Sequence, residues 1–235
     1  MRIAKFISHS GYCSRRDAEK LIVKNKVKLN YYICNNPATN VSINDKIIIN
    51  NKIIKINNKI RIWLVYKPIG IITSSKDYRG RKSIFEIIPK SLSKIISVGR
   101  LDINSEGLII MTNNGDLARY FELPKSEFKR IYKVRVQGKV DSVSLAKLSK
   151  GITIEGTKYK AIRAKLEKQM NSNAWIIMEL KEGKNREIRK ICKHLGWRVN
   201  KLIRIQFGQF NIGKLKPGEI IELKNHPYND KNYWR

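Results

Sequence analysis

The sequence predicts an α+β fold with a small N-terminal domain over residues 1–58 and a larger domain over residues 62–224. Helix-like and strand-like segments follow one another without regular β-α-β alternation, which favours a mixed, mainly antiparallel sheet with flanking helices. An Asn- and Lys-rich stretch at 51–61 separates the two regions and is interpreted as a linker, with residues 59–61 joining the domains. Hydrophobic residues make up 42% of the 235 residues, enough for a core in each domain.

The N-terminal domain is predicted to contain two short helices followed by strands. Apolar residues at positions 3, 6 and 7 have helical spacing. Ser14 is a suitable N-cap for a second helix, with Asp17 three residues later as in a capping box. Strands are expected at 27–29, 32–34 and 46–49.

Two arginines, Arg15 and Arg16, stand at the start of the second helix, where positive charge opposes the helix macrodipole. A charged helix face is usually only a solvated face. Because these two charges slightly destabilise the start of the helix, a role in binding a partner is favoured over a purely solvated face.

The larger domain is predicted to alternate strands and helices irregularly. Pro68 and Gly70 indicate a turn after the first strand. Residues 225–235 are expected to form a frayed tail. Strands are expected at 62–66, 95–98, 108–111, 132–136 and 174–180, and helices at 83–88, 116–122, 142–148 and 184–195.

The net charge of +30, from 49 Lys and Arg against 19 Asp and Glu, indicates a polyanionic partner. A Lys-, Ile- and Asn-rich genome would also raise the lysine count, but it does not explain arginines clustered at particular turns. A nucleic acid is therefore the favoured partner. DNA is a weaker alternative, because no recognition helix with the usual spacing is present.

Metal, redox and membrane functions have little support. Cys13, Cys34 and Cys192 are far apart and odd in number, and the three histidines are scattered. These cysteines fit a reducing compartment. No apolar run is as long as a membrane span, and the N-terminus has no apolar signal core. We therefore expect a cytoplasmic protein.

The most informative segment is 99–117, Gly-Arg-Leu-Asp-Ile-Asn-Ser-Glu-Gly-Leu-Ile-Ile-Met-Thr-Asn-Asn-Gly-Asp-Leu. It places Asp102 beside Arg100 in a turn that leads into an apolar strand, and catalytic groups favour such loops on rigid elements. On residues 102–107 alone, an Asp that caps its own turn is the more ordinary interpretation. The longer segment reverses this preference.

Segment 99–117 closely resembles the active-site segment of one branch of the RNA pseudouridine synthases, which holds the small-subunit type A and the large-subunit types B, E and F. The resemblance extends over about 2–224 and includes Lys67-Pro68-x-Gly70, the 182–190 segment and Leu215-Lys216-Pro217-Gly218-Glu219. The segment from Arg2 to Ile54 resembles the S4 RNA-binding domain, although Tyr31 stands where a glycine usually follows Asn30. Residues 185–189 look more like the large-subunit type B enzymes than the small-subunit type.

This resemblance implies the site residues. Asp102 matches the catalytic aspartate, Tyr132 the tyrosine that packs on the target base, and Arg189 the basic residue that pairs with the aspartate. Arg100 matches the residue thought to help displace the base, and Leu202 and Ile203 look like an apolar wall. Further substrate contacts are implied for Lys67, Asn185 and Arg186, and RNA contacts for Arg15 and Arg16. The ordinary alternatives are an inward ring on a strand for Tyr132 and a solvated helix arginine for Arg189.

The predicted function is isomerisation of a specific uridine in ribosomal RNA, most consistent with 23S rRNA. The alternatives are the same reaction on 16S rRNA and a non-catalytic RNA-binding factor in ribosome assembly. The reaction breaks a C–N bond, forms a C–C bond and requires an extruded base. It transfers no group to or from another molecule, so we expect no cofactor and no metal. A structured rRNA stem-loop is the expected partner, with no small-molecule substrate, and the protein is expected to act as a monomer.

Overall fold

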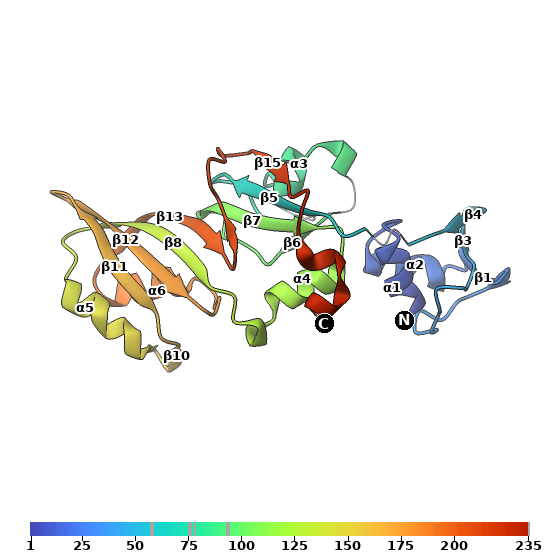
Figure 1. The fold of residues 1–235 in the computed structure, drawn as a ribbon, viewed down its shortest axis with the longest axis horizontal. Coiled ribbons are helices and arrows are strands. Elements are labelled where there is room, and N and C mark those ends of the chain that lie inside the picture. The colour runs from blue at the N-terminus through green and yellow to red at the C-terminus, as the bar shows by residue number, and fades with distance from the viewer. Residues whose placement is uncertain (57–58, 75–76, 78, 93–94, 235) are drawn as a thin grey trace.

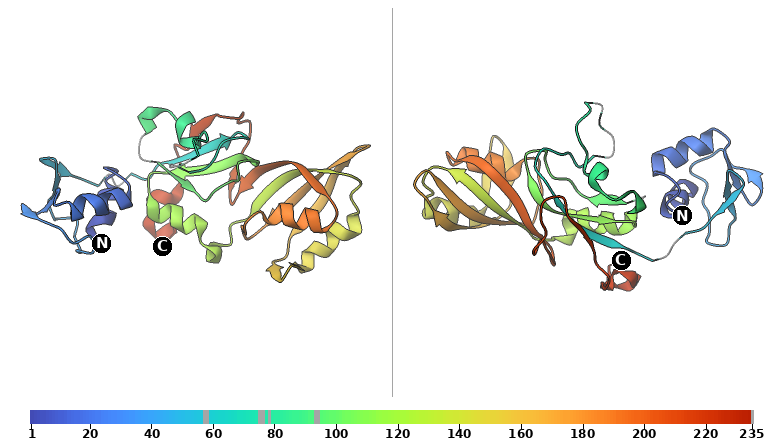
Figure 2. Two further views of the ribbon diagram at one scale, coloured as in Figure 1. Left: turned by 180° about the vertical axis from the view of Figure 1, so that it is seen from behind. Right: turned by 90° about the horizontal axis from the view of Figure 1, so that it is seen from above.

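The computed structural model describes residues 1–56, 59–74, 77, 79–92 and 95–234. The molecule is elongated, with the N-terminal domain at one end and a long twisted sheet through the rest (Figure 1). Two further views show the same order, with the N-terminal domain beside α4 (Gly115–Glu122) (Figure 2). The predicted α+β class with a mixed, mainly antiparallel sheet is confirmed.

The N-terminal domain packs two helices on a small antiparallel sheet in the order β2-β1-β3-β4. Ser14 accepts a hydrogen bond from the Asp17 amide (3.2 Å) and caps the second helix as predicted. The elements are α1 (Ile3–His9), α2 (Arg15–Val23), β1 (Val27–Leu29), β2 (Tyr32–Ile33), β3 (Ile47–Ile49) and β4 (Lys52–Ile54).

The interpretation of 51–61 as a linker is wrong at both ends. Asn50 and Asn51 both have positive φ (50° and 59°) and form a tight turn that pairs β4 with β3. Asparagine tolerates this left-handed conformation, so an Asn-rich segment here makes a hairpin and not a free connection. At the other end, Ile60 is buried in the core of the larger domain, and Arg61 forms an ion pair with Glu222 (2.5 Å). Residues 57 and 58 lie outside the described residues.

The turn where Tyr31 replaces glycine is held by side chains. Asn30 and Tyr31 have φ of 48° and 74°, so the chain keeps a glycine-like geometry without glycine. The Asn30 amide donates to Asp45 (2.8 Å), and its carbonyl oxygen accepts from the Lys46 amide (2.9 Å). These bonds offset the steric cost of the left-handed tyrosine.

The larger domain is built on one continuous sheet in the order β11-β12-β8-β13-β7-β5-β15, with β6 paired to β7 and β14 to β13. Its strands are β5 (Ile62–Lys67), β6 (Ile96–Val98), β7 (Glu106–Thr112), β8 (Arg130–Gln137), β11 (Arg163–Gln169), β12 (Asn173–Leu180), β13 (Arg198–Phe207), β14 (Phe210–Asn211) and β15 (Ile220–Glu222). A small hairpin, β9 (Ile152–Ile154) and β10 (Thr157–Tyr159), lies apart from it.

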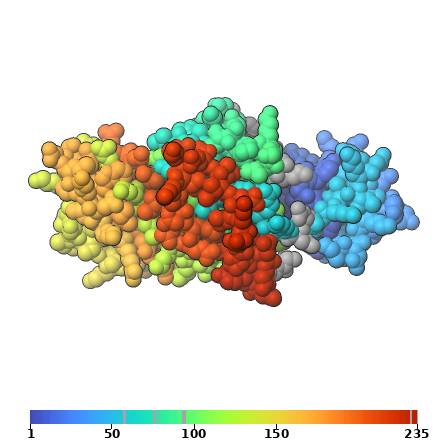
Figure 3. Space-filling model, turned by 45° about the horizontal axis from the view of Figure 1, so that its top comes forward, coloured from blue at the N-terminus to red at the C-terminus, as the bar shows by residue number. Residues whose placement is uncertain are grey.

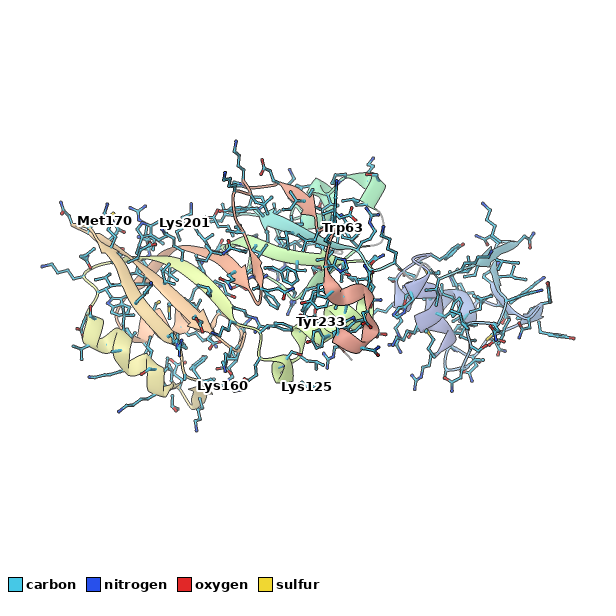
Figure 4. The ribbon with its side chains drawn as sticks, in the orientation of Figure 1. Trp63, Lys125, Lys160, Met170, Lys201 and Tyr233 are labelled. Carbon is cyan, nitrogen blue, oxygen red and sulfur yellow. The ribbon has the colours of Figure 1, made fainter. Side chains whose placement is uncertain are left out.

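Helices pack on several parts of this sheet. The remaining α-helices are α3 (Ile84–Ile87), α5 (Ser142–Lys147) and α6 (Glu187–His194). Short 3-10 turns occur at Lys90–Leu92, Pro124–Ser126, Leu148–Lys150, Pro227–Asn229 and Lys231–Tyr233. One core packs α5 and α6 on β8 and β12, and another packs α4 on β7 and β5. The Met170 turn at the β11–β12 tip and Tyr233 beside α4 therefore lie in different halves of the domain (Figure 4).

The two halves join where β13 runs parallel to β7, with Ile203 opposite Glu106 and Arg204 opposite Gly107. A Cβ on Gly107 would lie 2.4 Å from the Arg204 carbonyl oxygen, and its φ is 107°. Only glycine permits so close an approach in this conformation. The Gly107 position therefore allows the halves to meet.

Two further sequence-based expectations are wrong. The expected frayed tail is wrong for residues 225–234, because Tyr228 and Trp234 are buried against Phe121 and Tyr120 of α4. The space-filling view shows this segment lying against the middle of the molecule (Figure 3). The helix expected from Lys184 begins only at Glu187, because Arg186 adopts a left-handed conformation (φ 51°).

Candidate active site

A pocket of about 630 Å³ opens where the two halves of the sheet join. Most of its lining comes from the loop before β7, the start of β8, residues 182–188 and β13, and residues 72–74, Arg81, Glu122 and Leu180 complete it. Its polar and charged lining side chains include Arg100, Asp102, Arg130, Tyr132, Glu187 and Arg204.

The loop that carries Asp102 is fastened by hydrogen bonds on both sides. Thr73 donates its hydroxyl to the Leu101 carbonyl (3.0 Å) and accepts from the Leu101 amide (3.2 Å). The Gly70 amide donates to the Ile103 carbonyl (2.9 Å), and the Ser105 amide to the Asp102 carbonyl (3.0 Å). Gly70 of the 68–70 turn and Thr73 thus hold the loop in place.

The Asp102 carboxylate itself is half-buried and faces the pocket. Among the described residues, this carboxylate has no ion pair within 4 Å and accepts no hydrogen bond from the backbone of its own turn. The turn-capping alternative therefore does not describe its geometry. A rigid loop presents a carboxylate that is available to a substrate.

Arg189 supports this loop from α6 and does not pair with Asp102. Its two terminal nitrogens donate to the Asn104 carbonyl (2.6 Å) and the Val199 carbonyl (3.4 Å). Burial lowers the pKa of Arg189, as does the nearby charge of Arg186, while the negative charge of Asp102 opposes this shift. The predicted direct ion pair between Arg189 and Asp102 is thus wrong, because the Arg189 guanidinium donates to carbonyl groups. The two charges are nonetheless close enough to interact.

Lys67 lies below the loop, out of reach of a substrate. It is fully buried, and its ammonium donates to the Pro68 carbonyl (3.0 Å) and the Ser105 carbonyl (2.8 Å). Burial lowers the pKa of Lys67 to about 8, against the opposing charges of Asp102 and Glu106. The predicted substrate contact is wrong, because the motif lysine ties together the turn after β5 and the start of β7.

Tyr132 and Leu202 line the pocket from the adjacent strands β8 and β13. Ile203 does not line it, although the sequence suggested a two-residue apolar wall. Successive side chains of a strand point to opposite faces, so Leu202 and Ile203 cannot both face the pocket. The residue that shares the inner face with Leu202 is Arg204.

Arg204, which is buried, and Arg130, which is half-buried, form a basic cluster that the sequence reasoning missed. Arg204 is 3% exposed, and its Nε donates to the Leu108 carbonyl (2.7 Å). Its Nη2 is buried and has no hydrogen-bond partner among the described residues. Arg130 donates to the Phe128 carbonyl (2.9 Å), and both guanidinium groups lie over the ring of Phe207, at 4.8 and 5.4 Å. Strand alternation from Leu202 would have placed Arg204 on this inner face.

Glu187 is a buried acidic residue of the pocket and was also missed. It is 4% exposed, and one carboxylate oxygen accepts from the Lys184 amide (2.9 Å), while the other has no hydrogen-bond partner among the described residues. Burial raises the pKa of Glu187 to about 7; the Lys184 amide opposes the shift and the charge of Glu182 adds to it. The signal in the sequence was an acidic residue directly after the basic 184–186 segment.

The exposed cations Arg100 and Arg186 line the pocket together with Asn185, and their contact with a substrate stays a prediction. Arg15 and Arg16 are exposed on α2 of the other domain, and Arg15 lies 3.4 Å from Glu19. In the part of the chain that the structure describes, no group of three or more His, Cys, Asp or Glu side chains is arranged to hold a metal ion. None of its described helices is long and apolar enough to cross a bilayer.

Comparison with known proteins agrees with this geometry. Residues 61–194 match the RNA pseudouridylate synthase family, and residues 1–47 match the S4 domain. A Rickettsia felis protein named as an uncharacterized RNA pseudouridine synthase is 50% identical, covering 95% of this chain and 97% of its own length. The ribosomal large subunit pseudouridine synthase B of Buchnera aphidicola is 38% identical, covering 96% and 94%.

A solved structure described as a pseudouridylate synthase superimposes with a TM-score of 0.66 at 26% identity, covering 95% of this chain and 96% of the other. The catalytic-domain match extends from the first strand, β5, through α6, so it includes the Asp102 loop, Tyr132 and Arg189. The chain belongs to the RNA pseudouridine synthase family, as a member with an N-terminal S4 domain.

Proposed function

We propose that this pseudouridine synthase isomerises a specific uridine of 23S ribosomal RNA, with Asp102 as the catalytic carboxylate. The observation that carries the assignment to Asp102 is its carboxylate, which lies at the pocket on a fastened loop and forms no ion pair within 4 Å among the described residues. The 23S target is supported by likeness to relatives named as large subunit enzymes, at 38% and 33% identity.

The reaction breaks the C1′–N1 bond of uridine and forms a C1′–C5 bond, and the proton at C5 is replaced by one at N1. Asp102 begins it by adding to the sugar C1′ or to the base C6, and either route requires the ionised carboxylate. Loop atoms that are already fixed need little rearrangement when the substrate binds.

The other pocket residues hold the extruded base. Tyr132 and Leu202 supply an aromatic and an apolar surface for the uracil ring, and Arg100 at the rim occupies the space that the base leaves. Arg189 and Lys67 act on the reaction through the loop, because both fasten its main-chain carbonyl groups. They are positioning residues for Asp102.

Binding of the RNA is attributed to charge. The net charge of +30 and the exposed Arg15 and Arg16 of the S4 domain favour phosphate contacts to a structured stem-loop. Because the reaction is redox-neutral and transfers no group to or from another molecule, the proposed mechanism uses no cofactor. Because its proposed substrate is ribosomal RNA, we propose that the enzyme acts in the cytoplasm, and that it acts as a monomer.

The test is a map of pseudouridines in the ribosomal RNA of a strain that lacks the gene. We expect one 23S site to be lost, and to return with the wild-type gene but not with Asp102→Asn, which keeps the shape and removes the charge. For the purified variant, the rate should fall by at least about 10³-fold, as when a nucleophile is removed. RNA binding and thermal unfolding should stay close to wild type.

Two results would refute parts of the proposal. Modification by Asp102→Asn at a near wild-type rate would remove Asp102 as the catalytic group. Loss of a 16S site in place of a 23S site would leave the chemistry intact and change the target.

A further inference from the structure

A second hollow of about 460 Å³ adjoins the active-site pocket. The two share a wall made by Thr73, Ser74, Gly99, Arg100 and Glu122. Beyond that wall the second hollow is lined by Phe85, Ile96 and Ser97. Nothing in the proposed reaction uses these three residues.

This second pocket lies on the side of the active site that faces the S4 domain. Ile96 and His9 both lie within 4 Å of the position that a Cβ on Gly115 would take, at 3.7 and 3.9 Å. Lys5 of α1 forms an ion pair with Asp116 in the first turn of α4 (2.7 Å). Figure 1 shows the same proximity of β6 and α4 to α1. RNA bound to both the S4 domain and Asp102 would therefore pass over this pocket.

The side chains of the pocket suit a nucleotide. Phe85 is half-buried and Ile96 is 40% exposed, so a ring and an aliphatic surface are available for stacking. Arg100 brings an exposed guanidinium for a phosphate, and Ser97 contributes a hydroxyl group. Aromatic side chains beside a cation are the usual way in which proteins hold an unpaired base.

The shared wall also connects this pocket to the catalytic loop. Glu122 accepts a hydrogen bond from the Gly99 amide (2.9 Å), and Thr73 makes two hydrogen bonds to Leu101. Both contacts lie within three residues of Asp102. A ligand in the second pocket would press on the backbone that positions the carboxylate.

We propose that the second pocket binds the base of a nucleotide near the target uridine, on the side toward the S4 domain, with Phe85 as its stacking surface. This inference rests on the proposed function, because it assumes that RNA enters the Asp102 pocket. It adds a subsite that recognises an extruded neighbouring base.

The experiment is a double-mutant cycle between protein and RNA. The probe is the ribosomal RNA hairpin that the full-length protein binds most tightly, with each loop nucleotide in turn made abasic. Phe85→Ala is compared with Ile87→Ala, which lies on the same helix, packs in the same core and lines neither pocket. Binding constants and single-turnover rates are measured for every pair.

We expect Phe85→Ala to weaken binding of the intact hairpin by about 10-fold, in the range of one stacking interaction. At one loop position the abasic hairpin should show the same loss, and the two losses should not add. Ile87→Ala should combine additively with every abasic position. If Phe85→Ala unfolds, Phe85→Leu keeps apolar volume without the ring, and should show the same coupling at a smaller size.

Additive losses at all positions, or equal effects of Ile87→Ala, would overturn the subsite. Coupling in binding without any isomerisation would support the subsite and count against the proposed function. Isomerisation without coupling would retain the proposed function and remove the subsite.

Discussion

Hydrogen bonds fix the main chain of Asp102, while its carboxylate stays available to a substrate. The residues around Asp102 explain this difference. Lys67 and Arg189 are both cations that interact with the charge of Asp102, yet each donates to a main-chain carbonyl group of the loop and not to the carboxylate. A cation that is already bonded to carbonyl oxygens keeps its position when the carboxylate reacts. The loop is therefore pre-organised, and its charge is balanced without a direct ion pair.

For Arg189→Ala we expect a loss of activity that exceeds the loss of RNA affinity. The variant removes the hydrogen bond that fastens the loop to α6 at Asn104 and a second one to Val199 of β13, and a misplaced catalytic group can cost about 10²-fold in rate. Arg189→Lys should restore only part of the rate, because one ammonium cannot reproduce the planar fork. Lys190→Ala, an exposed neighbour on α6, controls for the lost charge. Single-turnover rates and RNA-binding curves, measured for each variant, separate the loss of activity from the loss of affinity. An affinity loss with an unchanged rate would make Arg189 a phosphate contact.

Glu187 predicts a dependence of stability on pH. Its pKa rises from the ordinary 4.5 to about 7 on burial, so the folded state holds a proton that the unfolded state has released. Stability should therefore fall as pH rises from about 4.5 to about 7, by up to about 3 kcal/mol. Glu187→Gln should flatten this part of the profile. Urea unfolding at a series of pH values gives the slope, and an unchanged slope in Glu187→Gln would show that other groups cause it.

At the scale of elements, the parallel pairing of β13 with β7 creates the site. It brings the Asp102 loop, which precedes β7, beside Leu202 and Arg204 of β13. The close approach of these strands depends on Gly107, whose place no side chain can take without meeting the Arg204 backbone. The catalytic geometry thus depends on a glycine that has no chemistry of its own.

Gly107→Ala should destabilise the domain by about 3 kcal/mol or more, since backbone must move at a strained φ. Gly138→Ala is the matched control, because Gly138 has a similar φ (101°) with nothing within 4 Å of the added Cβ. The control should lose only about 1–2 kcal/mol, the cost of the left-handed conformation. Denaturant unfolding compares the two. Equal losses would show that contact with Arg204 is unimportant.

Local patterns predicted most elements of this fold because helix caps, strand alternation and turn residues act over a few positions. The Ser14 cap and the strands near 62–66 and 174–180 are examples. Departures arise where a single residue changes the backbone, as Arg186 does by delaying α6. Others arise from distant packing, which buries Lys67 and Trp234 and which no local pattern contains. The site was predicted from the resemblance of its motif to a known family. The position of Arg204 on the pocket face could have been predicted by applying strand alternation to β13.

At the scale of the whole molecule, the S4 domain and the catalytic domain meet through α1 and the start of α4. Lys5 pairs with Asp116 (2.7 Å), and His9 lies 4.0 Å from the same carboxylate. Exposed ion pairs of this kind contribute at most about 1 kcal/mol. The N-terminal core is formed by its own helices and strands, so each domain has a separate hydrophobic core.

Removal of residues 1–58 should therefore leave a folded catalytic domain with weaker RNA binding. The cut must preserve Ile60 and Arg61, since Ile60 is buried in the catalytic core and Arg61 pairs with Glu222. For every phosphate that the S4 domain neutralises, its removal should lower the slope of log affinity against log salt by about 0.7–0.9. Arg15→Ala with Arg16→Ala in the full chain should reproduce part of that change. Binding titrations at several salt concentrations measure it, with thermal unfolding as the control for folding. An unchanged slope after truncation would show that the S4 domain makes no electrostatic contribution to RNA binding, and that the charge which attracts the RNA lies on the catalytic domain.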